Sequence, residues 1–201
     1  MVRGSKFDPA DFVDAALVLL SEGGPSAVTM SAIARRSGAP TGSIYHRFPS
    51  RSAVVAAAWL RALGGFAGEI ETALASGAGR TASALVGWSR AHPREARALF
   101  LNEPGELFDT APPDDLSAAI RAVEARIERA FQAALDSAEP AADRDEAFAR
   151  LRFVVVDGPA ALIRPYLQSG APIPAFVDDI AARLGGLAVD APRTRHPEAA
   201  E

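Results

Sequence analysis

The stretch TMSAIARRSGAPTGSIYHRF, from Thr29 to Phe48, decides the fold because it joins two short apolar patterns through a glycine. The first pattern, residues 30–37, follows Thr29, a residue type that caps helix N-termini, and stops at Gly38. The second, residues 40–48, opens with a proline, which suits the first position of a helix. Two short helices joined by a glycine-containing turn form a helix-turn-helix arrangement, whose second helix enters the major groove of DNA.

Polar side chains gather around the start and outer face of the second predicted helix. The apolar seam that would lock the two helices together is supplied by Ile33, Ala34, Ile44 and Phe48. The remaining positions carry groups suited to phosphates and base edges: Thr41, Gly42, Ser43, Tyr45, His46 and Arg47. The alternative is that these are ordinary solvated positions on a small helical hairpin, since short patterns of this kind recur by chance.

The rest of the 201-residue chain also has helical periodicity, without sustained alternation of β-branched residues, so we predict an all-α protein. A first helix is expected at 9–22, between Asp8 as its cap and the GGP sequence that ends it, and Ser50 is expected to cap a long helix. Further helices are predicted at 114–137, 143–168 and 174–187, with Pro159 and Pro165 breaking or kinking the second of these. We divide the chain into a helix-turn-helix domain (1–55), an all-α regulatory and dimerisation domain (56–190) and a disordered tail (191–201).

Composition narrows the classes of function. The chain has no cysteine, which excludes disulfides, thiolate nucleophiles and zinc–cysteine sites. The N-terminus lacks the apolar core of a signal peptide, and we find no apolar run of membrane-spanning length, so a cytoplasmic protein without a membrane partner is expected. The net charge is −4, yet residues 1–60 carry six Lys or Arg against four Asp or Glu. Only this N-terminal part of the chain has a net positive charge, which suits the binding of a polyanion.

From Phe12 to Val54 the chain resembles the N-terminal domain of the TetR family of transcriptional regulators. The resemblance rests on the spacing of Thr29, Ile33, Ala34, Gly38, Gly42, Tyr45, Phe48 and Arg51. It implies a three-helix helix-turn-helix domain followed by a helical ligand-binding and dimerisation domain, with Tyr45 touching phosphate and Arg51 at a position where the family usually carries a phosphate-binding Lys. Our candidate DNA-binding residues are Thr29, Arg36, Thr41, Gly42, Ser43, Tyr45, His46, Arg47 and Arg51.

A second segment, from Asp157 to Leu187, resembles the C-terminal region of many TetR-family members. The resemblance implies that the last two long helices form a four-helix bundle with a second subunit. The predicted helices agree, because 143–168 is apolar on more than one face and 174–187 carries an apolar stripe. The predicted dimer interface comprises Leu151, Val155, Leu162, Phe176, Ile180 and Leu184. The alternative is that both apolar faces are buried inside one chain.

A pocket for a small apolar or amphipathic effector is also implied by the resemblance. Candidate lining residues are Trp88, Phe100, Phe108, Phe131 and Phe153, although aromatic residues at such spacings are more often plain core. Charged residues that could orient an effector, such as Arg97 and Arg126, are equally readily solvated or paired.

An enzyme is the competing class, and the fragment GWSRA at 87–91 approaches the nucleophile elbow of α/β-hydrolases. It lies in a predicted helix rather than after a strand, so we predict no catalytic residues, and no cofactor or metal either. The prediction is a homodimeric, ligand-responsive DNA-binding regulator, most simply a repressor, on a palindromic double-stranded operator. An all-α protein–protein interaction module is the alternative, but it leaves the 29–51 pattern unexplained.

Overall fold

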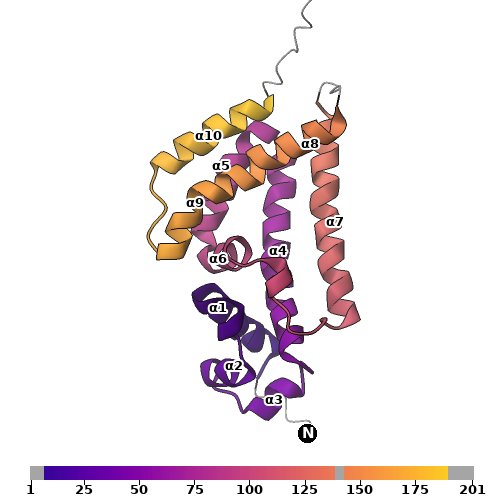
Figure 1. The fold of residues 1–201 in the computed structure, drawn as a ribbon, viewed down its shortest axis with the longest axis vertical. Helices are drawn as coiled ribbons and strands as arrows, with labels where there is room; N and C mark the ends of the chain where they lie inside the picture. The colour runs from indigo at the N-terminus through magenta and orange to yellow at the C-terminus, as the bar shows by residue number, and fades with distance from the viewer. Residues whose placement is uncertain (1–6, 139–142, 190–201) are drawn as a thin grey trace, which may run out of the picture.

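The computed structural model describes residues 7–138 and 143–189, and within these ranges the chain is helical and contains no β-strand. The all-α prediction is therefore confirmed. Three helices at one end of the molecule lead into a long helix that runs into the body (Figure 1): α1 (Pro9–Ala27), α2 (Met30–Ser37), α3 (Thr41–Tyr45) and α4 (Arg51–Ala75). The tail predicted to be disordered, 191–201, lies outside the described residues.

The first helix begins as predicted but continues beyond its predicted end. The Asp8 carboxylate accepts a hydrogen bond from the Ala10 amide at 2.9 Å, and the Asp8 amide donates to the carboxylate of Asp11, which completes a capping box. At Gly24 the backbone turns to φ 69°, and one more helical turn follows. Because Pro25 has no N–H, the carbonyl of Ser21 cannot receive the usual helical hydrogen bond from this position.

The helix-turn-helix pair forms where the sequence predicts it. The Thr29 hydroxyl accepts from the Ala32 amide at 3.0 Å, which caps α2. Gly38 ends that helix in the left-handed conformation, with φ 68°, as a glycine readily does. Ile33 and Ile44 are fully buried and close the seam between α2 and α3. However, α3 is a helix of five residues rather than the predicted nine.

The long helix α4 is the central element of the molecule. Ser50 caps it by accepting from the Ala53 amide at 3.1 Å, as predicted. By length and composition alone α4 could cross a membrane, but 61% of its apolar window is buried inside the protein, as in the core helix of a folded domain. The boundary that we propose at residue 55 falls within α4, so the helix-turn-helix end and the body share one continuous helix.

The body is built around α4. Helix α7 lies along α4 over much of its length, and α10 packs on α5 (Figure 1). The remaining elements in the first part of the body are α5 (Ala78–Ala91), α6 (Pro93–Leu101), the 3₁₀ turn η1 (Pro104–Glu106) and α7 (Asp114–Asp136). Helix α6 contacts both α1 and α4, so it connects the DNA-binding end to the body.

The predicted helix at 143–168 forms as two α-helices joined by a π-helical segment rather than as a broken helix. Its parts are α8 (Arg144–Arg152), η2 (Phe153–Asp157) and α9 (Gly158–Ser169), and α10 (Phe176–Val189) follows. The amide of Gly158 donates to the carbonyl of Phe153, five residues earlier. Since Pro159 has no N–H for Val155, a wider turn at this point lets the chain stay helical.

Candidate DNA-binding surface, dimer face and ligand cavity

The outer face of α3 is open to solvent at the tip of the molecule. Five of the six polar positions predicted to face DNA are exposed, and Ser43 is half-buried. Tyr45 is 54% exposed, so its phenol is open to a partner in solution. Pro40 precedes α3 and provides no side-chain cap, so the first amides of the helix have no side-chain acceptor. Exposed hydroxyls, a phenol and uncapped amides are groups that bind phosphate.

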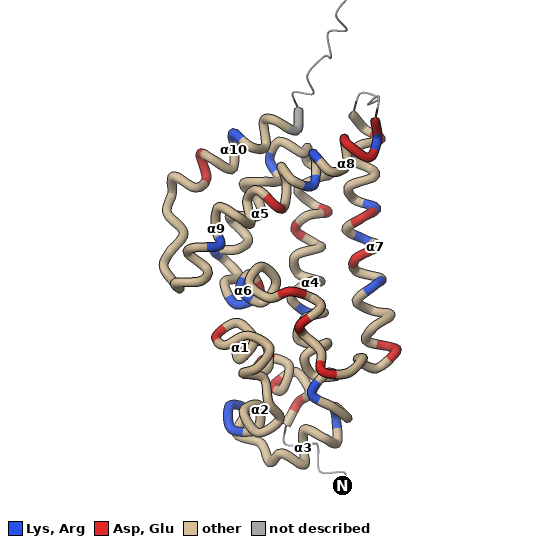
Figure 2. Tube along the Cα trace, viewed as in Figure 1, with Lys and Arg blue, Asp and Glu red and all other residues tan. Residues whose placement is uncertain are grey.

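Positive charge accompanies this surface. Figure 2 shows Lys and Arg segments on α2 and near the start of α4, beside α3. Arg36 makes only a loose pair with Glu22, at 3.5 Å between exposed side chains, and such a pair opens at little energetic cost. Thr29 is exposed and retains its hydroxyl proton while it caps α2, so it could still donate to a phosphate.

Arg51 differs from the other predicted DNA-binding residues because its guanidinium is directed into the protein. Its Nε donates to the Val28 carbonyl at 2.6 Å, its Nη2 donates to the Pro25 carbonyl, and its Nη1 pairs with the Asp109 carboxylate at 2.8 Å. Only 18% of the side chain is exposed. The phosphate contact predicted for Arg51 therefore requires these bonds to open, whereas here Arg51 ties the α1–α2 turn to the segment before α7.

The exposed apolar surface lies on the last helices. Phe176, Ile180 and Leu187 of α10 are 54%, 38% and 49% exposed, and Phe153 of η2 is 56% exposed. Phe153 and Leu184 both lie within 4 Å of the position that a Gly158 side chain would take, so η2 and α10 present one continuous face. We call Phe153, Phe176, Ile180, Leu184 and Leu187 the C-terminal apolar face.

Two predicted interface residues belong to the chain's own core instead. Leu151 is 6% exposed and Val155 is fully buried, because this side of the α8–η2 segment packs inward. Neither side chain is available to a second chain in this arrangement. Leu162 and Leu184 are half-buried. Of the predicted interface set, Phe176 and Ile180 are the most open.

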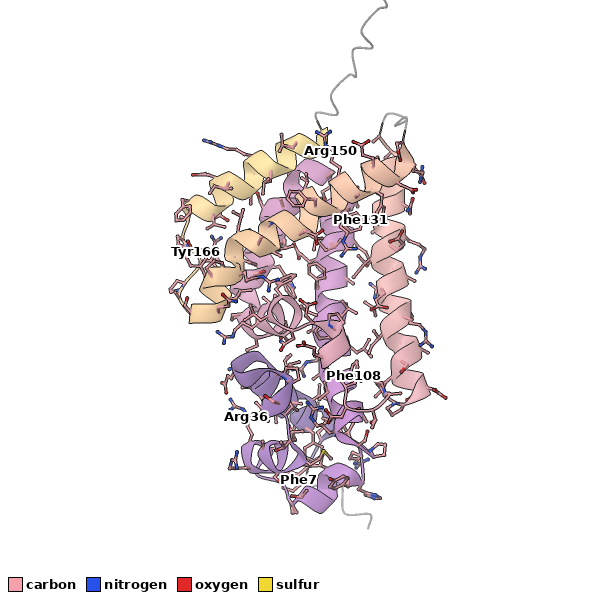
Figure 3. All side chains as sticks on the ribbon, in the orientation of Figure 1. Phe7, Arg36, Phe108, Phe131, Arg150 and Tyr166 are labelled. Atoms are coloured by element: carbon pink, nitrogen blue, oxygen red, sulfur yellow. The ribbon has the colours of Figure 1, made fainter. Side chains whose placement is uncertain are left out.

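The five aromatic residues predicted to line a pocket lie in different parts of the body, and none of them lines the cavity described below. Trp88 and Phe100 pack edge-on against Phe66, with ring centroids 5.5 and 5.6 Å apart. Phe108 lies in the segment between η1 and α7, and Phe131 lies towards the far end of α7 (Figure 3). Phe153 lies on the surface, because it belongs to the C-terminal apolar face. The first four are core or near-core packing residues, which is the alternative raised above.

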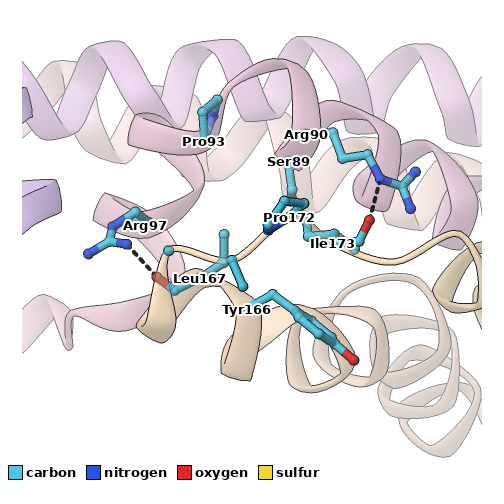
Figure 4. A pocket seen from close by; sticks show the side chains of 10 residues that line it. Ser89, Arg90, Pro93, Arg97, Tyr166, Leu167, Pro172 and Ile173 are labelled. Carbon is cyan, nitrogen blue, oxygen red and sulfur yellow. Dashed lines mark hydrogen bonds between the residues drawn. The ribbon is translucent and has the colours of Figure 1, made fainter.

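A cavity of about 360 Å³ opens elsewhere, between α5, α6, the end of α9 and the segment that leads to α10 (Figure 4). It is lined by Ser89, Arg90, Pro93, Arg97, Tyr166, Leu167, Gly170, Ala171, Pro172 and Ile173. Apart from Arg97, none of these residues was predicted to contact a ligand. The only local signal was the SGAP sequence after α9, which marks a turn but not a cavity.

Two arginines line this cavity, and they differ in the charge of their hydrogen-bond partners. Arg90 donates to both carboxylate oxygens of Asp178, at 2.8 and 2.7 Å. This hydrogen bonding raises the pKa of Arg90 and lowers the pKa of Asp178. Arg97 instead donates to two main-chain carbonyls, those of Ser21 and Leu167. Arg126, which was predicted with Arg97 as a residue that could orient an effector, is paired with Glu71 on the surface.

The hydrolase-like fragment lies within α5, in the helical context that the sequence predicts. Its serine, Ser89, is fully buried and donates to the Leu85 carbonyl at 2.9 Å. Among residues 7–138 and 143–189, no group of three His, Cys, Asp or Glu side chains could hold a metal ion.

Comparison with solved structures shows the same fold in several transcriptional regulators. FadR from Bacillus subtilis, in complex with stearoyl-CoA, is similar with a TM-score of 0.67 and 14% identity, over 91% of this chain and 98% of that chain. The fatty acid degradation regulator FadR from Bacillus halodurans is similar with a TM-score of 0.64 and 16% identity, over 92% of this chain and 100% of that chain. A tetR-family transcriptional regulator from Streptomyces coelicolor is similar with a TM-score of 0.58 and 21% identity, over 90% of this chain and 78% of that chain.

A search of curated protein sequences gives no match. Residues 12–58, which contain the helix-turn-helix and the start of α4, match the family described as "Bacterial regulatory proteins, tetR family". Residues 12–58 of this chain therefore form an N-terminal domain of the type found in the tetR family of bacterial regulatory proteins.

Proposed function

We propose that this regulator is a cytoplasmic, ligand-responsive repressor that binds a near-palindromic operator as a homodimer. The observation that carries the proposal is the exposed polar face of α3, at the opposite end of the molecule from the C-terminal apolar face (Figure 1). One end is suited to DNA, and the other is suited to a second copy of the chain.

On the DNA, α3 would enter the major groove with its N-terminal residues towards the base edges. Thr41 and Ser43 can exchange hydrogen bonds with bases, so we assign them to sequence recognition. Tyr45, His46 and Arg47 are exposed at the end of α3 and after it, and we assign them to the phosphate backbone. Phosphate contacts fix the orientation of the protein, whereas base contacts select the sequence.

A dimer formed through the C-terminal apolar face would set the spacing of two recognition helices. In helix-turn-helix dimers the half-sites lie about 34–36 Å apart, one turn of DNA, or a multiple of that distance. Burial of Phe153, Phe176 and Ile180 would also remove an apolar surface from water, which a monomer leaves exposed.

An effector would act by favouring a conformation in which that spacing no longer fits DNA. A ligand that prefers this state by about 1–3 kcal/mol lowers operator binding roughly 5- to 150-fold. The stearoyl-CoA bound to the similar FadR from Bacillus subtilis supports an amphipathic ligand class. For the direction of regulation we take the simplest case, in which the ligand-free protein binds DNA and the ligand causes the protein to leave the DNA.

The test begins with selection of bound duplexes from random DNA, followed by fluorescence anisotropy with the selected and scrambled duplexes. We expect the selected sequence to contain two inverted half-sites and to bind at least about 10³-fold tighter than scrambled DNA at physiological salt. A Thr41→Ala variant should change the selected sequence, because Thr41 is assigned to base contacts. If wild type binds selected and scrambled DNA equally, sequence-specific regulation through α3 is ruled out.

A further inference from the structure

We propose that the cavity between α5, α6 and α9 binds an aliphatic carboxylate, and that Arg97 holds its carboxylate group. The inference names a site and a ligand class for the proposed ligand response, and so rests on that function, but its test contains no DNA. The volume of about 360 Å³ lies within the range of small-molecule sites.

The cavity has apolar walls and two charged ends. Pro93, Leu167, Pro172 and Ile173 supply hydrocarbon surface, and Figure 4 shows Pro172 between Arg97 and Arg90. The charge of Arg90 is matched by the bidentate pair with Asp178. Within the described part of the chain, no carboxylate lies within ion-pair distance of Arg97. An unmatched cation beside an apolar wall selects a ligand with one anionic end and a hydrocarbon body.

The hydrogen bonds of Arg97 leave room for that anion. Its Nε donates to the Ser21 carbonyl at 2.7 Å, and its Nη1 donates to the Leu167 carbonyl at 2.6 Å. Its Nη2 has no hydrogen-bond acceptor among the described residues. Both present acceptors are neutral carbonyls, so a carboxylate would add an attraction between opposite charges that neither of them supplies. A carboxylate can therefore engage Nη1 and Nη2 together in the fork that guanidinium offers.

The two present acceptors are carbonyls that their helices leave unpaired. Ser21 lacks its helical donor because Pro25 has no N–H. Leu167 lies in the last turn of α9, and the Ala171 amide, which would continue that helix, donates to the Ser169 hydroxyl instead. Arg97 thus joins the kink of α1 to the end of α9 across α6. A ligand that draws the guanidinium into the cavity weakens the bond to Ser21 and loosens α1 around its kink.

Octanoate is a suitable probe, with octanamide as an uncharged analogue of the same shape, and calorimetric titration measures their binding. We expect octanoate to bind wild type at least about tenfold tighter than octanamide, as one charge-assisted pair implies. Arg97→Gln should lose a similar factor for octanoate. Arg94→Gln removes an exposed arginine of the same helix that does not line the cavity, and it should bind within about twofold of wild type.

The comparison of octanoate with octanamide needs no variant, so a folding defect in Arg97→Gln cannot leave the proposal undecided. Equal binding of the two probes to wild type, or equal octanoate binding by wild type and Arg97→Gln, would overturn the site. The link to α1 is read by hydrogen exchange: peptides that cover residues 19–29 should exchange faster with saturating octanoate in wild type. Unchanged exchange there would overturn the link. Neither measurement depends on an operator, so failure of the site is distinguishable from failure of the proposed repression.

Discussion

Gly185 and Gly186 are adjacent in α10, yet we predict that alanine at these two positions changes stability in opposite directions. A Cβ atom at Gly185 would overlap the carbonyl oxygen of Gly79 and lie 2.9 Å from its carbonyl carbon, where α10 crosses the start of α5. The obstacle is backbone, so no side-chain rotation relieves the clash. At Gly186 a Cβ meets no atom within 4 Å.

For Gly185→Ala, displacing α10 from α5 should cost about 1–3 kcal/mol of unfolding free energy, the usual range for overpacking. In a chain of this size the melting temperature should fall by roughly 2–12 °C. Gly186→Ala and Gly68→Ala should instead stabilise by about 0.5–1 kcal/mol, because alanine loses less backbone entropy in a helix than glycine does. Both control positions are helical and open.

Thermal and urea denaturation of the three variants and wild type, at one protein concentration, measures these differences. The concentration must match because dimer formation would add to apparent stability. If Gly185→Ala is as stable as Gly186→Ala, the close packing of α10 on the backbone of Gly79 is refuted, and with it the position of the C-terminal apolar face relative to α5.

Four further predictions concern the DNA-binding end, the C-terminal apolar face and the ion pair at the cavity. Tyr45→Phe should weaken binding to selected and scrambled duplexes by the same factor, roughly 3- to 10-fold for one lost hydrogen bond, in anisotropy titrations; a change confined to the selected duplex would contradict the phosphate assignment. Arg51→Ala should lower thermal stability even without DNA, because three carbonyls and Asp109 lose their donor; unchanged melting would mean that these bonds do not stabilise the free protein. Ile180→Glu should convert the dimer to a monomer in sedimentation equilibrium, since a carboxylate would be buried in the apolar face; an unchanged dimer would place the interface elsewhere. The pKa of Asp178 is lowered on folding, so the pair with Arg90 stabilises the protein above the unfolded pKa of that carboxyl, and this contribution is lost as the pH falls through the lower folded pKa. Asp178→Asn should therefore make the unfolding free energy depend less on pH below about pH 4 than it does in wild type. Parallel pH profiles for the two proteins would contradict a stabilising pair.

The helix starts were predictable because they depend on neighbouring residues alone. Asp8, Thr29 and Ser50 each accept a hydrogen bond from an amide two or three residues later, a contact that is local in sequence. The helix-turn-helix was predictable for the same reason, since Gly38 and the apolar seam lie within twenty residues. Helix ends were less predictable: α1 continues past Gly24, and the carbonyl of Pro25 in this further turn accepts a hydrogen bond from Arg51, which is distant in sequence.

The body was harder to predict because its surfaces are decided by distant contacts. An apolar pattern on more than one face of 143–168 does not tell which face the chain itself covers. The structure buries Leu151 and Val155 and exposes Phe153, and a π-helical turn before Pro159 changes the register between them and α9. The cavity likewise forms where three helices and a connecting segment meet, so no single stretch of sequence carries its signal.

The links between the DNA-binding end and the body suggest why a small ligand could be sufficient to move one against the other. Besides the shared helix α4 and the apolar packing of α1 against α4 and α6, the connections include hydrogen bonds and an ion pair: Arg97 to the Ser21 carbonyl, Arg51 to Leu107 and Asp109, and Ser52 to Thr110. A net hydrogen bond in a protein contributes about 0.5–1.5 kcal/mol, because water replaces the partner when it breaks. Exchanging one or two of these links therefore costs about as much as the 1–3 kcal/mol that typical allosteric coupling requires. The apolar core that runs from α1 into the body limits how far the two parts can separate, because a larger separation would expose hydrocarbon to water with nothing to compensate.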